Sequence, residues 1–75
     1  MNEFEVVVRG PNGYIEFGRY RSSLIDDAID ASERLIKNLA DDGYIWLYNG
    51  SDGCTVVYKE SVTSFSVKPV EEEKK

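Results

Sequence analysis

The fold is decided by the stretch EFEVVVRGPNGYIEFGRYR, residues 3–21. Its first part, Glu3–Arg9, alternates around three apolar residues and is rich in valine, as expected of a strand. The turn Gly10–Gly13 (GPNG) then supplies a proline that presets a turn dihedral and a glycine that can adopt a left-handed conformation. A second strand follows over Tyr14–Arg21. We therefore predict an antiparallel hairpin with a bulged turn.

Charge predicts the register of this hairpin. Pairing the two residues that flank the turn sets Glu5 opposite Arg19 and Glu3 opposite Arg21. Opposite charges that face each other across an antiparallel pair stabilise it.

A helix is predicted downstream of the hairpin, from Ser23 to about Ala40. Ser23 can cap the first turn, and Asp26 completes a capping-box pattern. Gly43 lies just beyond the end, where helix stops are common. Seven residues share one face of this helix and are expected to pack on a sheet: Ile25, Ala28, Ile29, Ser32, Leu35, Ile36 and Leu39.

Three more strands are predicted after the helix, over Tyr44–Asn49, Cys54–Lys59 and Val62–Lys68. Gly50–Gly53 (GSDG) forms the first turn between them, and a tight turn at residues 60–61 forms the second. Pro69 ends the regular structure because proline cannot continue a strand ladder. We expect a single α+β domain over residues 1–69, with a disordered charged tail over residues 70–75.

The order of elements is strand, strand, helix, strand, strand, strand. This order predicts one helix packed on one face of a mostly antiparallel sheet. Strand alternation assigns one face to the core beneath the helix: Phe4, Val6, Val8, Ile45, Leu47, Val56, Tyr58, Phe65 and Val67.

The opposite sheet face is unusually apolar for a face with no second helix to cover it. It is predicted to carry Phe17, Tyr44, Trp46, Tyr48 and Val57. Exposed aromatic residues of this kind mark interaction sites. We interpret this face as a surface for a partner or for a homodimer.

Composition argues against catalysis. The 75 residues include no histidine, which removes the usual general base and the commonest metal ligand. Cys54, the single cysteine, has no activating neighbour and is expected to be a small core residue. The aspartates lack the spacing of a calcium loop. We predict no enzyme activity, no catalytic residue, no metal site and no cofactor.

Fourteen acidic and nine basic residues give a net charge of −5. This balance opposes direct binding to nucleic acid or to an anionic membrane, and it favours a protein partner with a basic surface. The chain shows no signal peptide, no transmembrane stretch and no disulfide pair, so a cytoplasmic location is expected.

Five carboxylates on the outer face of the predicted helix could pair with arginine and lysine in a basic groove: Asp26, Asp27, Asp30, Glu33 and Asp41. Asp30 with Arg34, and Glu33 with Lys37, are also spaced for pairs along the helix.

The organisation of residues 3–68 resembles small phage and mobile-element inhibitors of host defence, including anti-CRISPR proteins. The resemblance is carried by the hairpin, by the segment SSLIDDAIDASERL and by the segment YIWLYNGSDGCTVVYKE. It implies a stoichiometric inhibitor in the host cytoplasm that binds a nucleic-acid-handling protein, with carboxylates where phosphates would sit. It assigns no functional residue.

Two other functions remain open from the residues alone. One is a homo-oligomeric structural or assembly protein that uses the aromatic sheet face as its self-interface. The other is a protein that sequesters a small nucleotide-like ligand between tyrosine and tryptophan rings.

Overall fold

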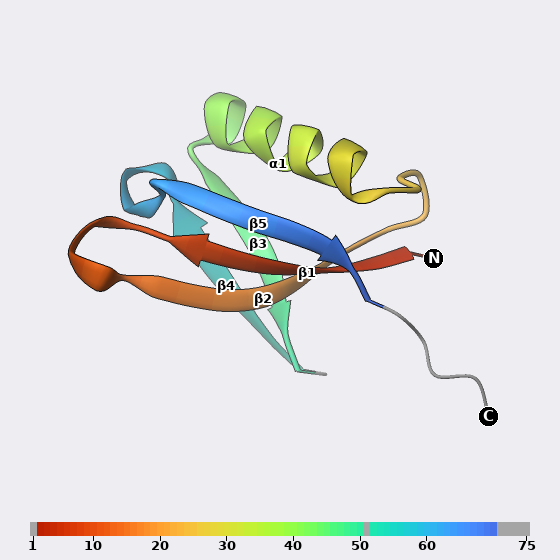
Figure 1. The fold of residues 1–75 in the computed structure, drawn as a ribbon, viewed down its shortest axis with the longest axis horizontal. Helices are drawn as coiled ribbons and strands as arrows, with labels where there is room; N and C mark the ends of the chain where they lie inside the picture. The colour runs from red at the N-terminus through yellow and green to blue at the C-terminus, as the bar shows by residue number, and fades with distance from the viewer. Residues whose placement is uncertain (1, 51, 71–75) are drawn as a thin grey trace.

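A computed structural model describes residues 2–50 and 52–70 of the chain. It confirms the α+β class and the predicted order of elements, with α1 lying across one face of the sheet (Figure 1). The elements are β1 (Asn2–Arg9), η1 (Pro11–Gly13), β2 (Ile15–Ser22), α1 (Ala28–Asp42), β3 (Tyr44–Asn49), β4 (Gly53–Tyr58), η2 (Lys59–Ser61) and β5 (Ser64–Pro69).

The first hairpin has the predicted turn and the predicted register. The Gly10 N–H donates to the Tyr14 carbonyl at 2.8 Å, and Gly13 is left-handed with φ 78°. Asn12 is left-handed as well, with φ 61°, a conformation that asparagine tolerates better than most residues. The β1–β2 ladder sets Glu5 opposite Arg19 and Glu3 opposite Arg21, as the charges predicted.

The sheet order is β4-β3-β2-β1-β5, and every recorded strand pair is antiparallel. Residues 59–63 therefore connect strands at opposite edges of the sheet instead of closing a hairpin. The edge strands of a flat five-stranded sheet would lie about 19 Å apart. The short link closes this distance because the sheet curls, and its ends bond to both halves: Lys59 N–H to the Gly43 carbonyl (2.9 Å) and Thr63 N–H to the Arg9 carbonyl (2.7 Å).

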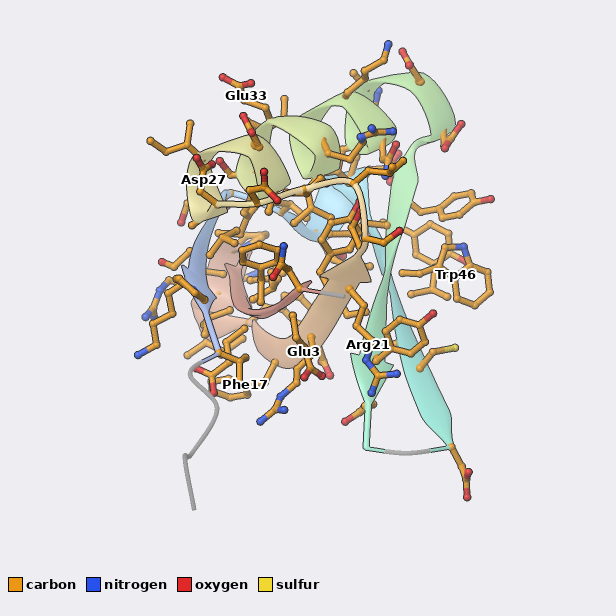
Figure 2. The ribbon with its side chains drawn as sticks, turned by 90° about the vertical axis from the view of Figure 1, so that its right-hand side faces the viewer. Glu3, Phe17, Arg21, Asp27, Glu33 and Trp46 are labelled. Atoms are coloured by element: carbon orange, nitrogen blue, oxygen red, sulfur yellow. The ribbon has the colours of Figure 1, made fainter. Side chains whose placement is uncertain are left out.

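The curl is concentrated where β3 meets β2. Arg19 and Tyr48 form the one ladder pair recorded between the described residues of these strands. Beyond that pair, β3 and β4 run at a steep angle to β1 and β2 (Figure 2). Leu47 packs directly on Gly18 at this crossing, where an added Cβ would overlap the leucine side chain. A larger residue at position 18 would push the two strands apart.

The core fills the space between α1 and the concave side of the curled sheet. One cluster of buried side chains joins β1, β3 and β4 to Leu35 of the helix, and a second joins β1 to the start of the helix. Tyr20 and Val67 pack against both clusters. The buried residues are Phe4, Val6, Val8, Ile25, Ala31, Leu35, Ile45, Leu47 and Val57.

The start of the helix was predicted wrongly. Its N-cap is Asp27, whose carboxylate accepts a 2.9 Å hydrogen bond from the Asp30 N–H, and not Ser23. Ile25 is buried against Phe4, and the Asn2 side chain donates to the Ile25 carbonyl at 2.7 Å. These contacts hold the segment before Asp27 against β1, so the helix begins only after it. The predicted stop is confirmed, since Gly43 is left-handed with φ 85°.

The packed face of the helix is also rotated from the predicted one. Ala31 and Leu35 are buried, whereas Ile29 and Ile36 are 70% and 56% exposed. The small side chain of Ala31 lets the first turns approach Phe4 closely. Contacts with the sheet therefore decide which side of the helix turns inward, even though the other choice would bury more apolar residues.

The alternation of β4 is inverted relative to the prediction. Val57 is buried, while Tyr58 is 58% exposed and Val56 is half-buried. The reason is the loop length: Gly53 pairs with Asn49 and belongs to the strand, so the loop is one residue shorter than the GSDG turn implied. A slip of one residue moves every side chain of a strand to the other face. Ser51, within that turn, lies outside the described residues.

The predicted tail is only partly described. The Val70 N–H donates to the Glu3 carbonyl at 3.0 Å, so the backbone stays on the edge of β1 one residue past β5. Residues 71–75 lie outside the described part of the chain. Within that part, no helix combines the length and apolar content that crossing a bilayer requires.

Candidate functional site

The candidate site is a group of four aromatic side chains on the convex side of β3 and β4. We call it the aromatic face, and it consists of Tyr44, Trp46, Tyr48 and Tyr58. The β3–β4 ladder places Tyr44 opposite Tyr58, Trp46 opposite Val56 and Tyr48 opposite Cys54. Residues paired in this way share a sheet face, so one short hairpin presents all four rings on the same side.

Contacts between the rings order this surface. The Tyr44 ring centroid lies 6.3 Å from those of both Trp46 and Tyr58, with interplanar angles of 77° and 67°. Edge-to-face pairs at this distance contribute about 0.5–1.5 kcal/mol each. Half-buried Tyr44 thus holds its two neighbours in place, while Trp46 and Tyr58 remain 57% and 58% exposed.

Tyr48 joins the aromatic face to a group of charged residues on β1 and β2. The Arg21 guanidinium carbon lies 4.8 Å from the Tyr48 ring centroid, a cation–π contact. The Arg21 Nε donates to the Glu3 carboxylate at 3.2 Å, and Arg19 lies 3.6 Å from the same carboxylate. These ion pairs are exposed, so each contributes about 0–1 kcal/mol. Both arginines are already paired with a carboxylate.

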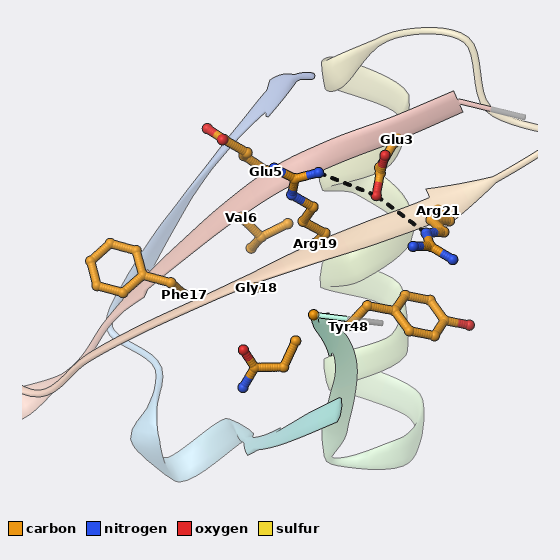
Figure 3. A pocket seen from close by; sticks show the side chains of 10 residues that line it. Glu3, Glu5, Val6, Phe17, Gly18, Arg19, Arg21 and Tyr48 are labelled. Carbon is orange, nitrogen blue, oxygen red and sulfur yellow. Dashed lines mark hydrogen bonds and ion pairs between the residues drawn. The ribbon is translucent and has the colours of Figure 1, made fainter. Parts of the chain in front are cut away.

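Two open depressions adjoin Tyr48. One, of about 430 Å³, lies where β2 and β3 diverge and is lined by Tyr20, Arg21, Trp46, Leu47, Tyr48, Asp52, Gly53 and Cys54. The other, of about 560 Å³, lies in the angle between the convex side of β1–β2 and the end of β3, with Phe17 on one wall and Tyr48 on the other (Figure 3). The depression between β2 and β3 is the more apolar of the two, and it adjoins Trp46, the most exposed aromatic ring of β3.

The structure separates two of the predicted sheet-face residues from this group. Val57 lies in the core, beside Ile45. Phe17 is 64% exposed on the convex side of β2, across the larger depression from Tyr48, and Figure 2 shows its side chain and that of Trp46 on different sides of the view. Cys54, expected in the core, is exposed next to Tyr48.

Sequence reasoning missed Tyr58, which replaces Val57 on this face. The signal that could have found it is the loop length between β3 and β4. Pairing Asn49 with Gly53 makes Tyr44 and Tyr58 partners and places both tyrosines on one face.

The predicted acidic helix surface is exposed but mixed in charge. Asp27 caps the helix, and Asp41 accepts from Lys37 at 3.1 Å. Arg34 and Lys37 line the same shallow depression as Asp30 and Glu33. The pairs predicted for Asp30 with Arg34 and for Glu33 with Lys37 are not among the ion pairs of the described residues. Asp26 has a 3.5 Å contact from the Asn2 side chain.

Acidic residues also border the aromatic face. Exposed Asp42 and Glu60 lie two positions beyond Tyr44 and Tyr58, at one end of the face. Asp52 lies at the other end, in the turn before β4. The strands between them, β3 and β4, contain no charged residue. The surface is therefore an aromatic centre flanked by Asp42, Lys59 and Glu60 at one end and by Asp52 at the other.

The chemistry available at this surface is stacking, apolar contact and hydrogen bonding through tyrosine hydroxyls and the Trp46 N–H. Residues 2–50 and 52–70 contain no group of three or more histidine, cysteine, aspartate or glutamate side chains that could hold a metal ion.

Comparison of the chain with protein-family models, curated proteins and solved structures found no match.

Proposed function

We propose that this protein is a non-catalytic binding protein whose aromatic face contacts a protein partner. One observation carries the proposal: exposed Trp46, Tyr48 and Tyr58 and half-buried Tyr44 stand together on the convex side of two strands that contain no charged residue. A surface of this kind loses free energy when it is covered, and tryptophan and tyrosine dominate the energetics of protein interfaces.

The charge distribution supports a basic partner. Asp42, Asp52 and Glu60 flank the apolar centre in the chain and outnumber Lys59 and Arg21, the basic residues next to it, and the whole chain has a net charge of −5. An apolar centre with a charged rim is the usual arrangement of a protein interface, and the charged rim mainly sets the association rate and specificity. Nucleic acid fits less well, since Arg19 and Arg21 are already paired with Glu3.

An inhibitor of a host nucleic-acid-handling protein is the form of this function that the resemblance to anti-defence proteins implies. The helix and its approach provide a second acidic surface, on the opposite side of the sheet from the aromatic face: residues 26–42 contain six acidic and two basic residues. In this form of the proposal, the partner extends around the domain, so that its lysine and arginine residues contact Asp30 and Glu33 while the aromatic face supplies most of the binding energy.

The test is affinity capture from a bacterial lysate with three versions of the protein as bait. These are the wild type, Trp46→Ala, and the double variant Asp30→Lys with Glu33→Lys. We expect a partner that the wild type retains and Trp46→Ala loses, since truncating a central interface tryptophan costs about 2 kcal/mol or more. Ile15→Ala, the truncation of an exposed apolar side chain at the start of β2 and outside both surfaces, is the matched control and should retain the partner.

Two outcomes would redirect the proposal. A partner kept by Trp46→Ala but lost by the helix double variant would place the binding surface on α1. A partner kept by all the variants would contradict both surfaces. Far-UV circular dichroism of each bait should match the wild type, because the substituted side chains are exposed.

A small planar ligand is the second candidate, favoured by the 430 Å³ depression beside Trp46, Tyr48 and Arg21. A ring could stack on Trp46 there, and Arg21 could contact an anionic group. Titration with a panel of mononucleotides should then quench the fluorescence of Trp46, the only tryptophan. Unchanged emission across the panel would remove this candidate.

A further inference from the structure

The inference concerns β4, which is one of the two edges of the sheet. Its residues Gly53–Tyr58 (GCTVVY) include no charge and no proline. An edge strand presents unpaired backbone N–H and C=O groups that can pair with another strand, and proteins usually block such edges with lysine, proline or a bulge. β4 lacks the lysine and the proline.

The other edge is blocked in the usual way. β5 (SFSVKP) carries Lys68 and ends in Pro69, which has no N–H to donate. The contrast between the two edges within one small sheet indicates that β4 is left open for pairing.

Charge indicates which occupant fits this edge. Two copies of a chain with a net charge of −5 repel each other at most surfaces. β3 and β4 together contain no charged residue, and a register centred on Thr55 sets Asp52 of one copy opposite Tyr58 of the other, so a second copy can pair along β4 without setting like charges opposite each other. The uncharged edge thus offers a second copy a route that avoids most of this repulsion.

We propose that β4 pairs antiparallel with β4 of a second copy about a two-fold axis perpendicular to the sheet. Such an interface is isologous, meaning that both copies use the same surface. Antiparallel pairing keeps the convex side chains of both copies on the same side, and with Thr55 on the axis, Cys54 of each copy lies opposite Val56 of the other. Val56 therefore lies next to the axis.

This arrangement deepens the proposed function and rests on it. Because pairing occurs edge to edge, the aromatic face stays uncovered, and the faces of the two copies become one continuous surface across the junction. The binding surface for a partner is then doubled, with Tyr58 of each copy next to the junction. A single copy holds only half of it.

The test is sedimentation velocity from low micromolar to millimolar protein. Pairing of six residues a side gives less than the roughly 1,200–2,000 Å² of stable complexes, so we expect a dissociation constant in the micromolar range. Val56→Lys places like charges near the axis and should weaken the dimer about tenfold or more. Ser66→Lys, an exposed convex residue of β5, is the matched control and should leave the dimer unchanged.

A second measurement uses Cys54, the only cysteine and an exposed one. In the register centred on Thr55, the two Cys54 residues lie within about 15 Å of each other. A bismaleimide of that reach should therefore cross-link the wild type to a dimer in proportion to its sedimentation behaviour, and Val56→Lys should suppress the product.

Monomer throughout the concentration range would overturn the inference, and so would a dimer that Val56→Lys leaves intact. These results are separable from the fate of the proposed function. A monomer that still retains a partner through Trp46 would overturn the dimer alone, whereas a β4 dimer whose partner survives Trp46→Ala would overturn the aromatic-face proposal alone.

Discussion

At the scale of single residues, Gly18 determines how closely β2 and β3 cross. It faces the core opposite Val6, and Leu47 of β3 packs on it where the two strands cross. Position 18 has no room for a side chain, because even a Cβ would overlap Leu47. The direction of the β3–β4 hairpin, and with it the placement of Trp46, depends on this missing side chain.

We therefore expect Gly18→Ala to destabilise the protein. Overpacking of this kind costs about 1–3 kcal/mol, because the strands must separate to admit the methyl group. Urea unfolding followed by far-UV circular dichroism measures the loss. Ser66→Ala, on the exposed face of β5, is the control and should change the free energy of unfolding by less than about 0.5 kcal/mol. Equal stability of Gly18→Ala and the wild type would show that the crossing is looser than described.

At the scale of elements, contacts with β1 set where the helix begins. Ile25 is buried and the Asn2 side chain bonds its carbonyl, so the residues before Asp27 follow β1 rather than a helical path. The rotation of the helix follows from the same contacts, which turn Ala31 and Leu35 inward and leave Ile29 and Ile36 outside. Local capping patterns near Ser23 are overridden.

The position of the helix N-cap predicts different effects for substitutions at Asp27 and at Ser23. Asp27→Ala removes the hydrogen bond to the Asp30 N–H and should lower the free energy of unfolding by about 0.5–2 kcal/mol. Ser23→Ala should change it by less than about 0.5 kcal/mol, because Ser23 lies outside the helix. Thermal and urea unfolding of both variants provide the measurement. A larger loss for Ser23→Ala than for Asp27→Ala would move the helix start back to Ser23.

At the scale of the whole molecule, the curled sheet and the helix enclose a continuous core. β3 is joined to β2 by a single recorded ladder pair, yet Ile45 and Leu47 belong to the same buried cluster as Val6 and Leu35. Side-chain packing, rather than backbone hydrogen bonding, therefore holds the β3–β4 hairpin to the other strands. The aromatic face is rigidly placed because the opposite side of its two strands is core.

This packing predicts a single cooperative unfolding transition. Trp46 fluorescence reports on the β3–β4 hairpin, and far-UV circular dichroism reports on the helix and the whole sheet. We expect the two urea midpoints to coincide, since the loss of the hairpin would expose the cluster around Leu35. An earlier transition by fluorescence would show that the hairpin unfolds on its own and that the aromatic face is a mobile unit.

The sequence by itself determined the features that depend on near neighbours. The β1–β2 register follows from the GPNG turn and from charges that face each other, and the helix stop follows from Gly43. The order of elements and the α+β class follow from patterns of a few residues each. The exposed aromatic residues of β3 were predicted for the same reason, since Tyr44, Trp46 and Tyr48 alternate within one strand.

Only the tertiary structure decided the features that depend on residues far apart in the chain. Tyr58 replaces Val57 on the aromatic face because one residue fewer in the turn reverses β4. β5 pairs with β1 because the sheet curls until a short link reaches the opposite edge. Burial is shared among strands and helix, so which side of a helix or strand turns inward is settled when the core packs, and no local pattern contains that information.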